Sequence, residues 1–132
     1  MENLNHSRLL PAIIVSTVDL ERLSGLALAA MDRVPEVANA LIAEMDRATV
    51  LDVSAVPASV VRMGSTVRFR SGDGKERRVE LVFPVDADIA AGRISVLTPV
   101  GAALIGLSEG QSISFTTRDG REQRLTVLEV AG

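Results

Sequence analysis

The spacing of hydrophobic residues changes near residue 50, and this change limits the folds open to the chain. Before that point, apolar side chains recur every three or four residues, as they do on one face of an α-helix. After it, they alternate with polar side chains in short runs bounded by turn-forming residues, as in half-buried β-strands. The 132 residues are enough for one ordinary domain, or for a small domain with an appendage. We therefore expect an α+β protein divided into residues 1–52 and residues 53–132.

The first half predicts a hairpin of two helices. Residues 16–33 carry apolar side chains at helical spacing, and Ser16 followed by Asp19 resembles the capping box that begins many helices. Residues 33–36 (RVPE) should end this helix, because proline is tolerated at the first position of a new helix but not inside an old one. Since the break is short, the helices should lie antiparallel, with about 14–17 residues each.

The second half predicts a mostly antiparallel sheet and one short helix. Turn-forming residues 72–75 (GDGK) and 119–120 (DG) should each join two strands in a hairpin. The predicted strands are residues 66–71, 76–84, 93–98, 112–118 and 121–130. Residues 99–107 open with a proline and are mostly small and apolar, so they should form the short helix. Residues 53–61, which contain Pro57, should link the two halves.

Composition argues against several classes of protein. The formal net charge is −3 and no apolar run is long enough to cross a bilayer, so neither membrane binding nor sequence-specific nucleic-acid binding is expected. The absence of cysteine excludes disulfides and thiolate chemistry, and it fits a cytoplasmic protein. His6 is the single histidine, and its place near the terminus argues against a metal or catalytic role. We expect no cofactor, no metal site and no catalytic residue.

Residues 94–115 (ISVLTPVGAALIGLSEGQSISF) form the most prominent short motif. The glycines at positions 101, 106 and 110 resemble a phosphate-binding loop, but their spacing fits neither common fingerprint and no Lys-Ser/Thr step follows. Close packing and turns explain these glycines better. Pro99 should end the preceding strand and begin the helix, which would place Thr98 and Pro99 at an exposed strand end where a partner could bind.

Three groups of charged residues remain candidates for binding. Asp32 and Glu36 flank the expected hairpin tip, where two carboxylates could hold Mg²⁺ for a partner's active site or could simply be solvated. Asp86 and Asp88 share a loop that suits a charged docking rim better than a metal cage. The third group consists of four arginines: Arg68, Arg70, Arg77 and Arg78. They could form a basic stripe that binds single-stranded nucleic acid, but the chain has only three aromatic residues for base stacking. The simpler interpretation is that these arginines lie on solvated strand faces and pair with glutamates.

The second half resembles the C-terminal domain of the bacterial Gre transcript-cleavage factors, through residues 94–115 and the final LTVLEV run. The whole chain more closely resembles the Rnk family, named as regulators of nucleoside diphosphate kinase. Four blocks occur in order over residues 12–130: AEMDRATV, VRMGSTVRF, ELVFPVDAD and SVLTPVGAALIGL. The resemblance implies a short antiparallel coiled coil joined to an FKBP-like C-terminal domain. It also implies that this domain binds RNA polymerase at the secondary channel.

The resemblance further implies which residues contact the polymerase. Asp88 matches an acidic loop position of the Gre factors that is implicated in polymerase contact. The implied docking segment is Thr98, Pro99, Val100, Gly101 and Ala102. Gre factors carry a D-x-x-E tip on a long coiled coil that reaches the polymerase active site. Here the tip reads DRVPE, from Asp32 to Glu36, and the expected arms are short.

These features favour a non-enzymatic regulator that competes with Gre factors at the entrance of the secondary channel. One alternative is a Gre-like cleavage cofactor that holds Mg²⁺ with Asp32 and Glu36. Another is an FKBP-type prolyl isomerase, which the fold alone would suggest. The isomerase suits this chain poorly, because such pockets are lined by aromatic side chains and its three phenylalanines should point into the core.

Overall fold

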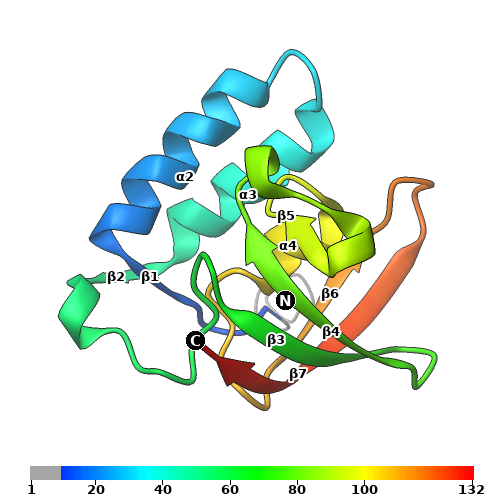
Figure 1. Cartoon of the computed structure of the whole chain (residues 1–132). Coiled ribbons are helices and arrows are strands. Elements are labelled where there is room, and N and C mark those ends of the chain that lie inside the picture. The colour runs from blue at the N-terminus through cyan, green and yellow to red at the C-terminus, as the bar shows by residue number, and fades with distance from the viewer. Residues whose placement is uncertain (1–9) are drawn as a thin grey trace, which may run out of the picture.

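The computed structural model describes residues 10–132 and has an α+β architecture (Figure 1). Strand β1 (Ile14–Ser16) leads directly into helix α2 (Thr17–Ala30), and helix α3 (Pro35–Arg47) then packs against α2. Strand β2 (Thr49–Leu51) follows and pairs in parallel with β1. The helical first half is confirmed, whereas the parallel pairing of β1 with β2 was not predicted. Among the residues described, no helix is long and apolar enough to span a membrane.

The second half forms a curled sheet that confirms the predicted strands and short helix. The strands are β3 (Thr66–Ser71), β4 (Glu76–Val82), β5 (Arg93–Ser95), β6 (Ser112–Thr116) and β7 (Glu122–Ala131). Their order in the sheet is β5-β4-β3-β7-β6, and every pairing is antiparallel except that of β4 with β5. Helix α4 (Pro99–Leu104) lies between β5 and β6 in the sequence. Strand β5 ends at Ser95 rather than at the predicted Thr98.

The beginnings of the first two helices follow the predicted signals. The Ser16 hydroxyl accepts a hydrogen bond from the Asp19 N–H at 3.0 Å, as a helix-capping serine does. The Asp19 carboxylate departs from the capping-box pattern, because it accepts from the Met63 N–H at 3.3 Å. Pro35 is the first residue of α3, with Glu36 behind it in the first turn. Asp19 therefore caps nothing in its own helix and ties α2 to the second half.

One hydrophobic core extends through both halves. Leu23 of α2 and Leu41 of α3 belong to the same buried cluster as Phe69 and Leu81 of the sheet and Leu104 of α4. All five side chains are at most 2% exposed. Figure 1 shows the helix pair on one side of the sheet. The helices are therefore held by buried apolar area, which contributes roughly 25 cal/mol for each Å² removed from water.

Residues 53–61 connect the halves as predicted, and three valines of this segment pack into the interior. Val56, Val60 and Val61 are all less than a tenth exposed, whereas the other residues of the segment are exposed or half-buried. The Val61 N–H donates to the Leu107 carbonyl at 2.8 Å, and its carbonyl accepts from the Gly106 N–H at 3.0 Å. The valines therefore attach the connecting segment to the core.

The packing role predicted for the glycines is clearest at Gly101. A Cβ atom on Gly101 would lie 2.2 Å from the Ser95 carbonyl oxygen and 2.8 Å from the Val96 Cα atom. Both are backbone atoms, so neither can move aside without shifting the end of β5. Only glycine lets α4 approach the preceding chain this closely, and the glycine thus serves packing rather than a ligand loop.

We predict that Gly101→Ala lowers the free energy of unfolding by about 1–3 kcal/mol, the usual cost of overpacking. The matched control is Gly25→Ala, because Gly25 is an exposed residue inside α2 with no atom within 4 Å of the added methyl group. This control should gain about 0.5–1 kcal/mol, since alanine favours helices more than glycine does. Urea unfolding of both variants measures the difference. Unchanged stability of Gly101→Ala would contradict the close approach.

Candidate functional site

The predicted docking segment lies at the step where β5 ends and α4 begins. Thr98 caps α4, because its hydroxyl accepts from the Gly101 N–H at 3.1 Å and donates to the Ser95 carbonyl at 2.7 Å. Pro99 is the first residue of the helix, as the sequence predicted. The step is therefore fixed by local hydrogen bonds and by the fixed backbone angle of proline.

The five residues of the segment differ in their exposure. Thr98, Pro99 and Val100 are half-buried and offer side-chain atoms to the surface. Gly101 and Ala102 are buried, and Ala102 is only 2% exposed. The first three can thus contact a partner, while the last two can act only by holding the step in shape.

Asp88 lies in an exposed loop between β4 and β5 that contains two short 3₁₀ turns, Pro84–Asp86 and Ile89–Ala91. Its carboxylate accepts from the Ala91 N–H at 3.3 Å, which caps the second turn. Val85 and Ile89 in the same loop are 89% and 88% exposed. Sequence reasoning named the aspartates and missed this apolar pair, although isolated large apolar residues in a polar loop were a visible signal.

The tip between α2 and α3 carries Asp32 and Glu36 on the surface. Glu36 is in the first turn of α3, where a carboxylate is favoured by the helix dipole. Within residues 10–132 there is no group of three or more His, Cys, Asp or Glu side chains that could hold a metal ion. His6 lies outside the residues described. A metal role for the two tip carboxylates has no further ligand to support it among the described residues.

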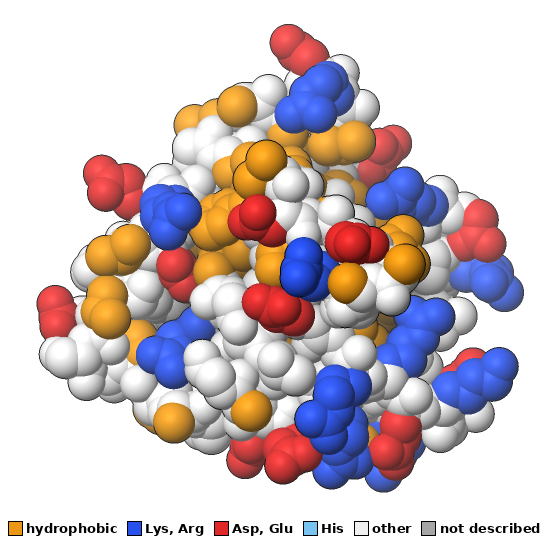
Figure 2. Space-filling view, in the orientation of Figure 1, with side chains coloured by type: hydrophobic (Ala, Val, Ile, Leu, Met, Phe, Trp, Pro, Cys, Tyr) orange, Lys and Arg blue, Asp and Glu red, His pale blue; other side chains and the backbone are white. Residues whose placement is uncertain are grey.

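Arg68 and Arg70 of the β3–β4 hairpin support the interpretation as solvated strand faces paired with glutamates. Arg68 lies 3.0 Å from a Glu76 carboxylate oxygen and 3.3 Å from one of Glu129, and Arg70 lies 3.7 Å from Glu76. The Arg68 guanidinium donates hydrogen bonds to the carboxylates of Glu129 and Glu76, and these bonds raise its pKa. Figure 2 shows basic, acidic and apolar side chains intermixed on this face of the molecule. A stripe of uncompensated positive charge is therefore not formed by Arg68 and Arg70.

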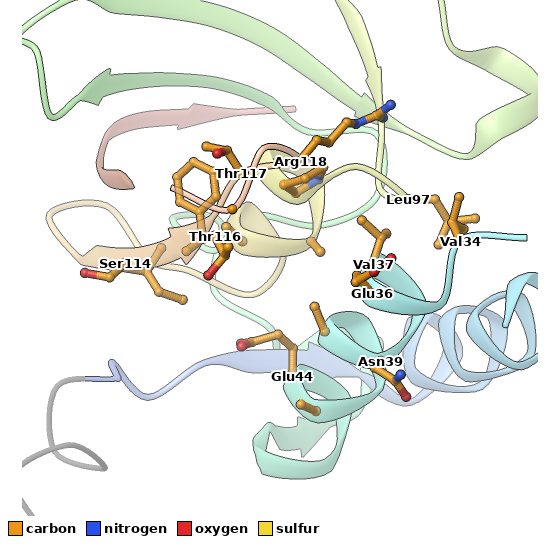
Figure 3. A pocket seen from close by; sticks show the side chains of 18 of the residues that line it. Val34, Glu36, Val37, Asn39, Glu44, Leu97, Ser114, Thr116, Thr117 and Arg118 are labelled. Atoms are coloured by element: carbon orange, nitrogen blue, oxygen red, sulfur yellow. The ribbon is translucent and has the colours of Figure 1, made fainter. Parts of the chain in front are cut away.

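Two neighbouring hollows, which the sequence did not reveal, lie beside the docking step. The larger is a groove of about 760 Å³ between α3, α4 and β6 (Figure 3). The smaller, of about 380 Å³, is lined by Thr98, Pro99 and Val100 together with Phe115 and Arg77. The structure thus brings the three half-buried residues of the predicted docking segment onto one concave surface. Asp88 lines neither hollow.

Comparisons with known proteins account for both halves of the chain. The model of the family described as Rnk N-terminus matches residues 11–51, and that described as transcription elongation factor, GreA/GreB, C-term matches residues 56–131. The protein named regulator of nucleoside diphosphate kinase from Escherichia coli (strain K12) is 39% identical over 121 residues, which cover 91% of this chain and 89% of its own. The chain belongs to the Rnk family. The resemblance seen in the sequence is therefore confirmed.

The second half of this Rnk-family protein is also similar to longer proteins. The transcription elongation factor GreA of Azorhizobium caulinodans is 41% identical over 78 residues, which cover 58% of this chain and 50% of GreA. A solved structure described as a prokaryotic transcription elongation factor GreA/GreB from Nitrosomonas europaea has a TM-score of 0.72 at 38% identity. It covers 91% of this chain and 99% of that one. Family membership thus identifies a Gre-like transcription factor.

We predict that Thr98→Ala lowers the free energy of unfolding by about 1 kcal/mol, because the helix cap is lost. Thr98→Ser is the matched control, since serine keeps a hydroxyl that can accept from the Gly101 N–H and donate to the Ser95 carbonyl. Its stability should stay close to that of the unaltered protein. Chemical denaturation compares the two variants, and equal stability of Thr98→Ala and the unaltered protein would show that the cap contributes nothing.

Proposed function

We propose that this Rnk-family protein binds RNA polymerase at the entrance of the secondary channel through residues 53–132. The observation that carries the proposal is the GreA/GreB C-terminal match over residues 56–131, which contains a docking step whose residues Thr98, Pro99 and Val100 reach the surface. In this proposal the curled sheet and α4 form an FKBP-like anchor, and Asp88 adds a negatively charged contact beside it. A cytoplasmic location follows from the partner.

The helical hairpin sets what the bound protein does. Helices α2 and α3 have 14 and 13 residues, which at 1.5 Å per residue is roughly 20 Å of coiled coil. Asp32 and Glu36 also lack the D-x-x-E spacing of the Gre tip. We propose that the protein occupies the Gre site, excludes Gre factors from it and does not stimulate transcript cleavage. The protein is then a non-enzymatic regulator, and an effect on nucleoside diphosphate kinase would run through transcription.

We further propose that residues 1–52 and 53–132 have different functions although they share one hydrophobic core. Residues 53–132 anchor the protein on the polymerase, while residues 1–52 carry the hairpin tip. The shared core supports this division of labour, because an anchor and a tip that pack together move as one body.

We predict that core RNA polymerase binds the protein at micromolar concentration and that excess GreA displaces it. Asp88→Asn should weaken binding about tenfold, which is about 1.4 kcal/mol. Asparagine keeps an oxygen that can accept from the Ala91 N–H, so the 3₁₀ turn should stay intact. The loss of affinity then measures the contribution of the negative charge. Pro99→Ala should weaken binding by a similar factor. Fluorescence anisotropy of labelled protein measures both binding and displacement.

The control for charge is Asp46→Asn, because Asp46 is exposed on α3 and lines neither hollow beside the docking step. This variant should bind as well as the unaltered protein. Thermal unfolding midpoints of all three variants should stay near that of the unaltered protein. The proposal fails if no binding is seen at micromolar concentration, or if each loss of binding is matched by a loss of stability.

A further inference from the structure

Strand β6 is an open edge of the sheet. It pairs with β7 on one side, and within residues 10–132 no strand pairs with its other side. Antiparallel pairs alternate between residues that exchange backbone hydrogen bonds and residues that do not. The Val127 N–H donates to the Gln111 carbonyl at 2.9 Å, and the Thr117 N–H donates to the Arg121 carbonyl at 2.8 Å. By this alternation the backbone groups of residues 112, 114 and 116 point away from β7.

The open edge borders the larger groove. Ser114 and Thr116 line one wall, and Val37, Ala40 and Ala43 of α3 line the other at helical spacing. In Figure 3 the labelled β6 residues and the labelled α3 residues lie on opposite sides of the opening. A strand added to β6 would run about 5 Å from it, and every second side chain of that strand would point to the side of the sheet on which α3 lies.

The positive charges of the groove lining are less compensated than the negative ones. Glu44 is compensated by Arg47, whose guanidinium lies 2.7 Å from its carboxylate. Arg33 and Arg118 also line the groove, and neither forms an ion pair with another described residue. Glu36 is the other carboxylate of the lining, so two arginines face one carboxylate that no described ion pair compensates. The lining therefore carries an excess of positive charge, which complements an apolar segment that also has an acidic residue.

We propose that the groove binds an extended peptide segment of a partner protein, which adds a strand to the free edge of β6. Backbone hydrogen bonds to residues 114 and 116 supply affinity, and an apolar side chain against α3 supplies specificity. An acidic side chain of the peptide meets Arg33 and Arg118. An unpaired sheet edge is a ready template for such pairing. This inference stands on the β6 edge and the groove beside it, and it does not depend on polymerase binding.

A phage-displayed library of random decapeptides, panned on the full-length protein, tests the proposal. Enriched peptides should alternate apolar and polar residues and carry an acidic residue. Their synthetic forms should slow amide hydrogen exchange at Ser114 and Thr116. Ser114→Pro removes the outward N–H without touching the β6–β7 bonds, so it should weaken binding at least tenfold. Ser114→Ala keeps the N–H and should bind normally, and Arg118→Gln should weaken only the acidic peptides.

Several results would overturn the proposal. They are the absence of any enriched peptide, equal binding to Ser114→Pro, and amides at Ser114 and Thr116 that are already protected in the free monomer. A dimer in light scattering that Ser114→Pro dissociates would assign the edge to a second copy of this chain instead. If Ser114→Pro does not fold, exchange protection at these two amides in the unaltered protein decides alone.

Discussion

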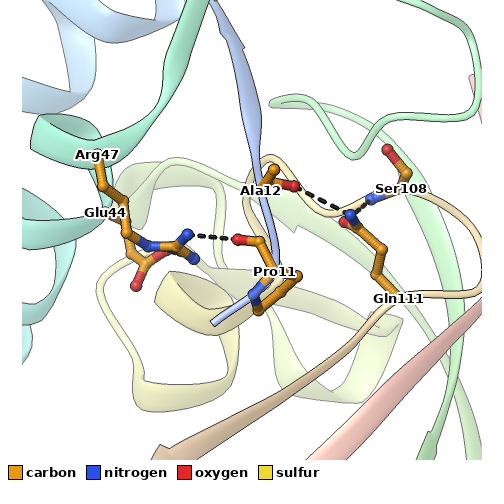
Figure 4. Close-up of polar contacts among 6 residues, drawn as sticks. All are labelled: Pro11, Ala12, Glu44, Arg47, Ser108 and Gln111. Atoms are coloured by element: carbon orange, nitrogen blue, oxygen red, sulfur yellow. Dashed lines mark hydrogen bonds and ion pairs between the residues drawn. The ribbon is translucent and has the colours of Figure 1, made fainter. Parts of the chain in front are cut away.

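The backbone of residues 11–16 is bonded to both halves of the protein at once (Figure 4). The Arg47 guanidinium, at the end of α3, donates to the Pro11 carbonyl. The Gln111 side-chain amide, just before β6, donates to the Ala12 carbonyl at 3.0 Å. These two hydrogen bonds, which we call the clamp, tie the segment to α3 on one side and to the chain before β6 on the other. The clamp adds to the shared hydrophobic core in holding the hairpin against the sheet.

Further contacts near the clamp also hold residues 11–16 and α2 against the second half. Gly106 comes so close to the segment that a Cβ atom there would lie 2.9 Å from the Ile13 Cβ atom. Its carbonyl accepts from the Ile14 N–H at 3.1 Å, and the Asp19–Met63 hydrogen bond joins the halves again one turn into α2. The shared core and these contacts predict that the hairpin and the sheet move as one body. In the proposed function, the short tip then keeps one position relative to the predicted docking step, which suits a protein that blocks a site rather than one that reaches into it.

Local signals were readable from the sequence, and long-range contacts were not. Ser16 and Pro35 marked helix starts, and Thr98 and Pro99 marked the step into α4, because caps and prolines act on their immediate neighbours. The parallel β1–β2 pair, the burial of Val56, Val60 and Val61 and the groove beside β6 each depend on residues far apart in the chain. Periodicity carries no information about such partners. For the same reason the family resemblance implied a docking segment, Thr98 to Ala102, without revealing that Gly101 and Ala102 are buried.

The distance between the hairpin tip and the β4–β5 loop tests the rigid arrangement most directly. The chain has no cysteine, so Asp32→Cys and Ala90→Cys place two spin labels at exposed positions without background labelling. Double electron–electron resonance measures the distribution of distances between the labels. A single narrow distribution is predicted, because one core and the clamp hold both elements. A broad distribution, or one with two separate maxima, would contradict this account.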